Sequence, residues 1–163
     1  MIAQDNTLNI TLPSDTEIVM SRAFDAPREL VFRAMWDPQL IPQWWGPRKY
    51  ETIVDHMDFR VGGTYRFLNK SKSGEIFAFF GEYREIVPNE KVVETFGFEG
   101  MPGEPGLVTY AFTEHDGRCL VTERSIFNSK AQRDGILQSG MEEGARETYD
   151  RFAELLEKLN KKK

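Results

Sequence analysis

The chain has 163 residues, a net charge of −5 and 40% hydrophobic residues, the composition of an ordinary globular domain with a sizeable core. This acidic balance, without a long basic run, argues against a nucleic-acid partner. The single Cys119 excludes an internal disulfide and favours a reducing compartment, and no apolar stretch is long enough for membrane insertion, so we expect a cytoplasmic location.

The first expected elements are one strand and two short helices. In residues 8–24, side chains alternate between two faces in two pieces, one on each side of Pro13. This pattern predicts a strand with a kinked leading arm. Residues 26–45 carry apolar stripes and prolines at positions typical of first helical turns, and Gly46-Pro47 ends them. Two short helices are therefore expected after the first strand.

Six further strands follow, separated by short turns that imply antiparallel pairing. Asp116-Gly117 is a strong signal for the tight turn of a hairpin. The strands are expected at 50–59, 64–70, 75–87, 91–98, 107–115 and 118–127.

The chain ends in an amphipathic helix, which a shorter helix over 129–138 precedes. Apolar residues recur at spacings of three and four from Met141 to Leu159, which predicts about 20 helical residues. An antiparallel sheet with one apolar face needs a cover, and only this helix is long enough. One helix cannot fill the whole concave face of about seven strands, so large side chains pack the remaining space or leave a pocket.

Aromatic residues occupy alternate positions of these strands, so their side chains share one face, and this pattern has two interpretations. They either form the core of the sheet or line a ligand cavity. Gly81 stands in the middle of a strand, where a glycine marks a bend or a close approach.

Two polar residues are candidates for orienting a ligand. Arg124 alternates with Leu120 and Thr122, a parity that suggests the covered face, although a surface position at a strand end is the alternative. His56 lies in the strand at 50–59. Two histidines and one cysteine give no metal-ligand spacing, and no nucleophile or phosphate-binding motif is present. We assign no catalytic residue, metal or cofactor.

Five segments together resemble a known family. They read "SDTEIVMSRAFDAPRELVFRAMWDPQLIPQWWGP", "DFRVGGTYRF", "GEYREIVPNEKVVETF", "LVTYAFTEHDGRCLVTERSIF" and "GMEEGARETYDRFAELLEKL". Their order and spacing are similar to those of the activator of heat-shock protein 90 ATPase homologues (AHSA-type), within the START-like, birch-pollen-allergen-like superfamily.

The resemblance implies an α+β helix-grip fold, in which a seven-stranded curved antiparallel sheet wraps around the long C-terminal helix. It implies one START-like domain over 1–163, with an N-terminal arm at about 1–13 and a folded core at 14–160. It also implies a deep, mainly apolar cavity. Relatives often have a tryptophan where this chain has Met141, which would reshape the pocket mouth.

Parity and resemblance together predict binding of a hydrophobic or amphipathic small molecule, such as a lipid, an aromatic compound or a polyketide. The predicted ligand-binding residues are Trp45, His56, Tyr65, Phe67, Phe79, Tyr83, Phe96, Tyr110, Phe112, Arg124, Met141 and Phe152.

Two other functions stay open. A cyclase or hydrolase would need polar groups converging in the cavity, and a docking module for a chaperone would need an exposed apolar patch. The chaperone hypothesis is weakened because only about 15 residues precede the expected fold. A homodimer is also possible through an edge strand.

The adjacent Trp44 and Trp45 are expected to divide two tasks. Trp44 follows Leu40 by four residues and is expected in the core, whereas Trp45 at the helix end is expected to wall the pocket.

Overall fold

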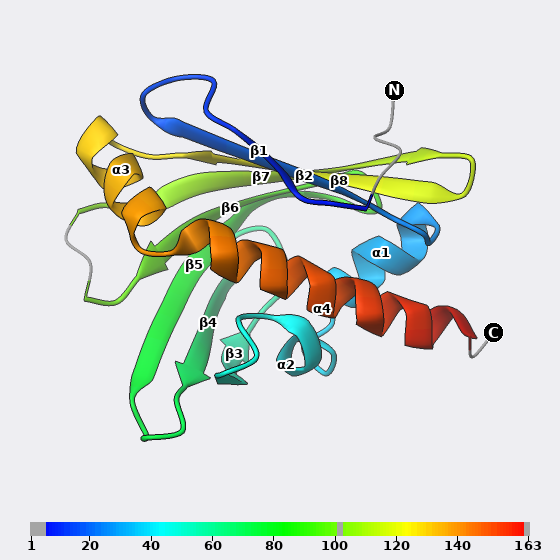
Figure 1. Cartoon of the computed structure of the whole chain (residues 1–163), viewed down its shortest axis with the longest axis horizontal. Helices are drawn as coiled ribbons and strands as arrows, with labels where there is room; N and C mark the ends of the chain where they lie inside the picture. Colours follow the sequence, from blue (N-terminus) through cyan, green and yellow to red (C-terminus); the bar gives the residue numbers. More distant parts are fainter. Residues whose placement is uncertain (1–5, 101–102, 162–163) are drawn as a thin grey trace.

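A computed structural model describes residues 6–100 and 103–161, and in it eight antiparallel strands form one open sheet (Figure 1). Their order across the sheet is β1-β2-β8-β7-β6-β5-β4-β3. The strands are β1 (Asn9–Thr11), β2 (Glu17–Phe24), β3 (Glu51–Met57), β4 (Thr64–Lys70), β5 (Ile76–Val87), β6 (Lys91–Phe98), β7 (Gly106–His115) and β8 (Arg118–Ile126).

Four helices complete the fold. They are α1 (Arg28–Met35), α2 (Ile41–Trp44), α3 (Lys130–Gln138) and α4 (Met141–Lys161). Figure 1 shows α4 lying across the concave side of the curled sheet, with α3 at its beginning and α1 and α2 near its later turns. This is the predicted α+β helix-grip arrangement, and the fold prediction is confirmed.

The strand count differs from the expected seven. The additional strand, β1, lies within the predicted leading arm and pairs with β2 through Asn9↔Ser21 and Thr11↔Val19. Because β1 lies at the edge of the sheet, its three residues need hydrogen bonds to one neighbouring strand only. Pro13 follows shortly after and prevents a longer strand. Residues 1–5 of the predicted arm, and 101–102 of the expected loop, lie outside the described residues.

The turn and helix signals of the sequence correspond to real structure. Asp116 and Gly117 both have positive φ, as the tightest hairpin turns require. Gly46 also has positive φ and follows α2 directly after Trp45, so the predicted stop is confirmed.

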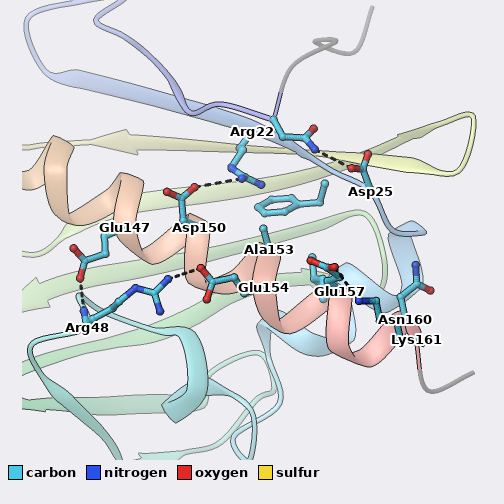
Figure 2. A pocket seen from close by; sticks show the side chains of 13 residues that line it. Arg22, Asp25, Arg48, Glu147, Asp150, Ala153, Glu154, Glu157, Asn160 and Lys161 are labelled. Atoms are coloured by element: carbon cyan, nitrogen blue, oxygen red, sulfur yellow. Dashed lines mark hydrogen bonds and ion pairs between the residues drawn. The ribbon is translucent and has the colours of Figure 1, made fainter.

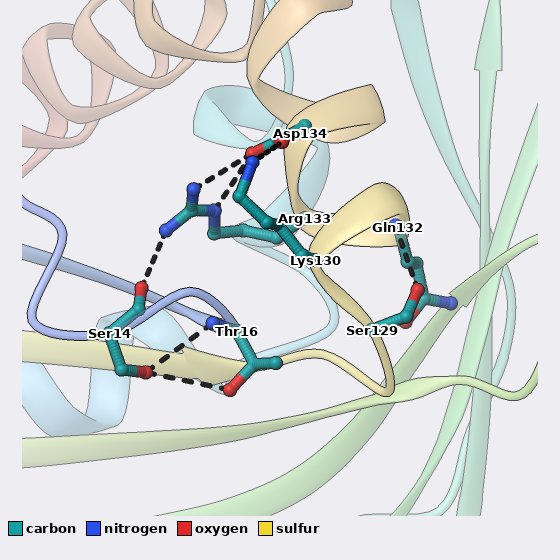
Figure 3. A network of polar contacts seen from close by, with 7 residues as sticks. All are labelled: Ser14, Thr16, Ser129, Lys130, Gln132, Arg133 and Asp134. Carbon is teal, nitrogen blue, oxygen red and sulfur yellow. Dashed lines mark hydrogen bonds and ion pairs between the residues drawn. The ribbon is translucent and has the colours of Figure 1, made fainter.

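Helix α3 is fastened to the segment before β2 (Figure 3). The Ser129 hydroxyl caps its first turn by accepting from the Gln132 amide at 3.0 Å. The buried Arg133 guanidinium donates to the carbonyl of Ser14 at 2.5 Å and to the Asp134 carboxylate at 2.8 Å. These contacts fix α3 at the end of the sheet where α4 begins.

The core fills the space between the concave face and the helices. Its most deeply buried members include Phe24 of β2, Val31 of α1 and Phe152 of α4. Within residues 6–100 and 103–161, no helix combines the length and hydropathy that a bilayer-spanning segment requires.

Candidate functional site

A cavity of about 390 Å³ lies between the concave face of the sheet and the first half of α4. Strands β2 and β4 to β8 contribute to its wall, together with the end of α1, α2, the end of α3 and α4. Its size falls within the range of small-molecule sites. The fold creates this space because one helix covers a face that eight strands span.

Seven predicted ligand-binding residues line this cavity. They come from α2's end, four strands and the start of α4, and they are Trp45, Tyr65, Phe67, Phe79, Phe96, Tyr110 and Met141. The rings pack on one another, and Trp45 makes edge-on contacts with Phe67 and Phe79 at centroid distances of 5.3 and 5.1 Å.

Three predicted residues lie in the packed core instead of the cavity wall. Tyr83 packs edge-on against Phe59, and Phe152 packs against Phe24. Phe112 packs against Phe32 of α1 with ring centroids 5.1 Å apart, because α1 covers this end of β7. For the aromatic residues of the strands, parity identified the concave face, but the helices decide which part of that face stays open.

The two predicted polar residues lie outside the cavity. The Arg124 side chain is half exposed and pairs with the Glu17 carboxylate of β2. The His56 side chain is also half exposed and shares a hydrogen bond of 3.1 Å with the Thr64 hydroxyl. A register shift between Val54 and His56 changes the alternation of β3 at this point. In β8, the odd-numbered residues face the helices, as the buried Cys119 and Val121 do, whereas Arg124 belongs to the opposite set.

Both adjacent tryptophans contribute to the cavity wall, which differs from the expected division. Trp44 is 5% exposed and packs on Phe152 at a centroid distance of 4.6 Å, yet it also lines the cavity. The carbonyl of Trp45 accepts a hydrogen bond from the Thr52 hydroxyl, and that of the next residue, Gly46, accepts from Arg151 at 2.6 Å. Strand β3 and helix α4 therefore hold the Trp45 backbone in place.

A buried carboxyl, Glu94 of β6, stands in the cavity wall beside Tyr65. The Tyr65 hydroxyl oxygen is 2.5 Å from Glu94 Oε2 and 2.7 Å from the Thr95 carbonyl oxygen. The Tyr65 hydroxyl is the donor in both contacts, so its one proton is shared between a carboxyl oxygen and a carbonyl oxygen.

The surroundings of Glu94 favour the neutral form of its carboxyl group. Burial raises the pKa of Glu94 to about 8, the nearby Glu123 adds to the rise, and the Tyr65 hydrogen bond opposes it. Gly81 of β5 makes room for the pair, because a Cβ there would lie 1.9 Å from the Thr95 carbonyl oxygen and 2.6 Å from the Tyr65 hydroxyl. The expected close approach at Gly81 is confirmed.

A second carboxyl, Glu123 of β8, reaches the same cavity. Its Oε1 accepts a hydrogen bond of 2.6 Å from the Tyr149 hydroxyl of α4. Burial raises the pKa of Glu123 to about 7, and the Tyr149 hydrogen bond opposes that rise. Tyr110 of β7 is the register partner of Glu123, so its side chain stands next to this carboxyl.

Sequence reasoning missed Glu94, Glu123 and Tyr149. The signals were present, because Glu94 alternates with Val92 and Phe96 on an apolar face. Tyr149 follows Ala145 by four residues on the apolar stripe of α4. Glu123 was missed because the opposite parity of β8 was considered for the covered face.

A separate groove lies on the outer side of α4, between this helix and β2 (Figure 2). It is larger, about 750 Å³, but several of its charged groups are paired with one another. Arg22 binds Asp150 at 3.3 Å, and Arg48 binds Glu154. The described part of the chain contains no group of three or more His, Cys, Asp or Glu side chains that could hold a metal ion.

Comparison with known proteins places this geometry in context. The family model described as "Activator of Hsp90 ATPase homolog 1-like protein" matches residues 25–157. No curated protein matches the chain significantly.

Several solved bacterial structures are similar. A protein from Mycobacterium smegmatis is 24% identical, with 94% of this chain and 99% of that chain covered and a TM-score of 0.84. A protein from Chromobacterium violaceum is 27% identical, with 85% and 96% covered and a TM-score of 0.75. The AHSA1 protein from Silicibacter pomeroyi is 20% identical, with 86% and 96% covered and a TM-score of 0.70.

Proposed function

The chain belongs to the family of activator of Hsp90 ATPase homolog 1-like proteins, whose fold commonly binds ligands, and we propose that it binds a small, mainly apolar molecule in the cavity under α4. The observation that carries the proposal is a cavity of about 390 Å³ with aromatic walls and a few convergent polar groups. Burial of apolar ligand surface against these rings would supply most of the binding free energy. The single, buried Cys119 supports the cytoplasmic location that we propose with it.

A cavity-filling variant tests this proposal. Ala145 lies on α4 and lines the cavity, so Ala145→Trp would occupy the space that a ligand needs. Binding is measured with the neutral dye N-phenyl-1-naphthylamine, whose fluorescence rises in an apolar site. The matched control is Ala131→Trp, because Ala131 is exposed on α3.

We expect the wild type and Ala131→Trp to bind the dye and Ala145→Trp to lose at least about tenfold in affinity, about 1.4 kcal/mol. Thermal unfolding of each variant shows that the fold is retained. Equal dye binding by both variants, or none by the wild type, would overturn the proposal. Native mass spectrometry of the purified protein identifies any molecule that it carries.

An acid–base enzyme, such as a cyclase or hydrolase, is the second candidate. The observation that favours it is the pair of carboxyl–tyrosine contacts, Glu94 with Tyr65 and Glu123 with Tyr149, in one apolar cavity. Groups with raised pKa values in a cleft are typical of proton-transfer catalysts. Chemical change of a co-purified molecule on prolonged incubation, absent in Glu123→Gln, would support this candidate.

Docking to a chaperone and self-association have less support. Among the described residues, the large exposed apolar side chains are Leu12, Val61, Ile76, Leu107 and Ile126. Of these, only Leu107 and Ile126 face each other as register partners, which is too little for the patch that a docking surface needs.

A further inference from the structure

Two polar groups in the cavity are left open to a ligand. The first is Glu123 Oε2, because Tyr149 occupies only Oε1 and the second oxygen is neither hydrogen-bonded nor covered by protein. The second is the Tyr110 hydroxyl, which has no hydrogen-bond partner among the described residues and is not covered either. Register pairing of the two residues in β7 and β8 places their side chains next to each other on the concave face.

Several uncharged polar side chains of the wall, such as Asn69, Ser125 and Thr148, also have atoms that make no hydrogen bond within the described residues. Glu94 is hydrogen-bonded to Tyr65 through Oε2 only. Trp36 and Trp44 have indole N–H groups without a partner, but protein atoms cover them, so they do not reach the open space. A ligand that enters the cavity therefore meets the carboxyl groups of Glu94 and Glu123 among uncharged polar groups.

The residues of the cavity wall that can carry a full charge near neutral pH are all acidic. Its ionisable acids are Glu94 and Glu123, and among the described residues that line it none is Lys, Arg or His. A carboxylate in such a place has no countercharge, and burial of an uncompensated charge is costly. A ligand anion would add a second uncompensated negative charge, whereas a ligand cation would compensate the first.

We propose that the cavity selects amphipathic amines, whose ammonium group donates hydrogen bonds to Glu123 Oε2 and the Tyr110 hydroxyl while the apolar body lies among the aromatic rings. This inference rests on the proposed function and names its ligand class. The aromatic rings that line the cavity favour a cationic ligand further, because ring faces attract cations. The same charge argument predicts weaker binding of fatty acids and other anionic amphiphiles.

The ionisation of Glu123 makes the selection dependent on pH. The groups that act on Glu123 from the surrounding elements are Glu94 of β6, Tyr65 of β4, Tyr110 of β7 and Tyr149 of α4. Burial holds the pKa of Glu123 near 7 in the empty cavity, and a bound ammonium group would lower it. Amine binding near pH 6.5 would thus release a fraction of a proton, and amine affinity would rise from pH 5.5 to pH 8.

Three naphthalene derivatives of similar shape test the inference by isothermal titration calorimetry. They are 2-naphthylmethylamine, 2-naphthalenemethanol and 2-naphthoate, which differ in charge. The variants are Glu123→Gln, Tyr110→Phe and the control Glu90→Gln, whose carboxylate is exposed in the turn between β5 and β6. Titration in two buffers of different ionisation enthalpy measures proton release.

At pH 8 we expect the amine to bind at least about tenfold more tightly than the alcohol, and the naphthoate more weakly than both. The amine preference should fall to within about twofold in Glu123→Gln, fall partly in Tyr110→Phe, and persist in Glu90→Gln. An amine no tighter than the alcohol, or an unchanged preference in Glu123→Gln, would overturn this inference. Since N-phenyl-1-naphthylamine is neutral, its binding to the wild type shows separately whether the proposed function stands.

Discussion

Two consecutive residues of α4 face different environments. Tyr149 points into the cavity and donates to Glu123, whereas Asp150 points into the outer groove and binds Arg22 at 3.3 Å (Figure 2). In the groove, acidic groups such as Asp150, Glu154 and Glu157 have cationic partners, as Glu154 has in Arg48. In the cavity, acidic groups have only tyrosine hydroxyls.

The difference shows how a carboxyl acquires a special role. In the groove, water and a nearby guanidinium stabilise the ionised form, so the groove is an ordinary charged surface. In the cavity, both kinds of stabilisation are missing, and burial keeps protons on Glu94 and Glu123 at higher pH than in water. The smaller cavity is therefore the stronger candidate site, although the groove has more volume.

Aromatic rings separate the two regions, and their removal should have the largest effect. Trp44 of the cavity wall packs on Phe152, which packs on Phe24 of the groove at a centroid distance of 5.2 Å. We expect Trp44→Ala to lower the free energy of unfolding by about 3–5 kcal/mol, measured by urea denaturation. Trp45→Ala, with its ring partly exposed, should cost less and mainly weaken ligand binding. Equal losses of stability would show that both rings serve the core alone.

The pH dependence of stability should distinguish the cavity acids from surface acids. Glu94 and Glu123 have pKa values raised by burial above the value of 4.5 of an unfolded chain. The folded chain then holds protons that the unfolded chain releases, so this stabilisation is complete below pH 4.5 and is lost as pH rises through about 7 and 8.

We expect Glu94→Gln and Glu123→Gln each to flatten the fall in stability between pH 5 and 8, by up to about 1.4 kcal/mol per pH unit. Thermal or urea unfolding at several pH values measures the slope, and Glu90→Gln should keep the wild-type slope. Identical slopes in all three variants would contradict the assignment of these protons.

The groove should give the smallest effect. The Asp150 side chain is 63% exposed, so Asp150→Asn should change the free energy of unfolding by less than about 1 kcal/mol. Arg22 keeps its hydrogen bond to the Ala23 carbonyl and its position over the Phe24 ring, 4.7 Å from the centroid. A loss above about 2 kcal/mol in low-salt buffer would show that this pair is as critical as the cavity contacts.

Periodicity predicted most of the fold because its signals are local. The expected strands at 64–70 and 91–98 agree with β4 and β6 residue for residue, since polar turns bound both. The site was predicted less completely. Seven lining residues were identified from parity and resemblance, but Phe112 lies under α1, and Arg124 lies on the outer face of β8.

The sequence by itself determined the order of the elements, the hairpin at Asp116-Gly117 and the covering helix. These features depend on side-chain alternation and backbone freedom, which a sequence displays directly. Only the tertiary structure decided which part of the covered face remains open and which acids reach it. Glu94 and Glu123 lie 29 residues apart in the chain (123 − 94), on strands that β7 separates, and the curvature of the sheet and the position of α4 bring them to one cavity.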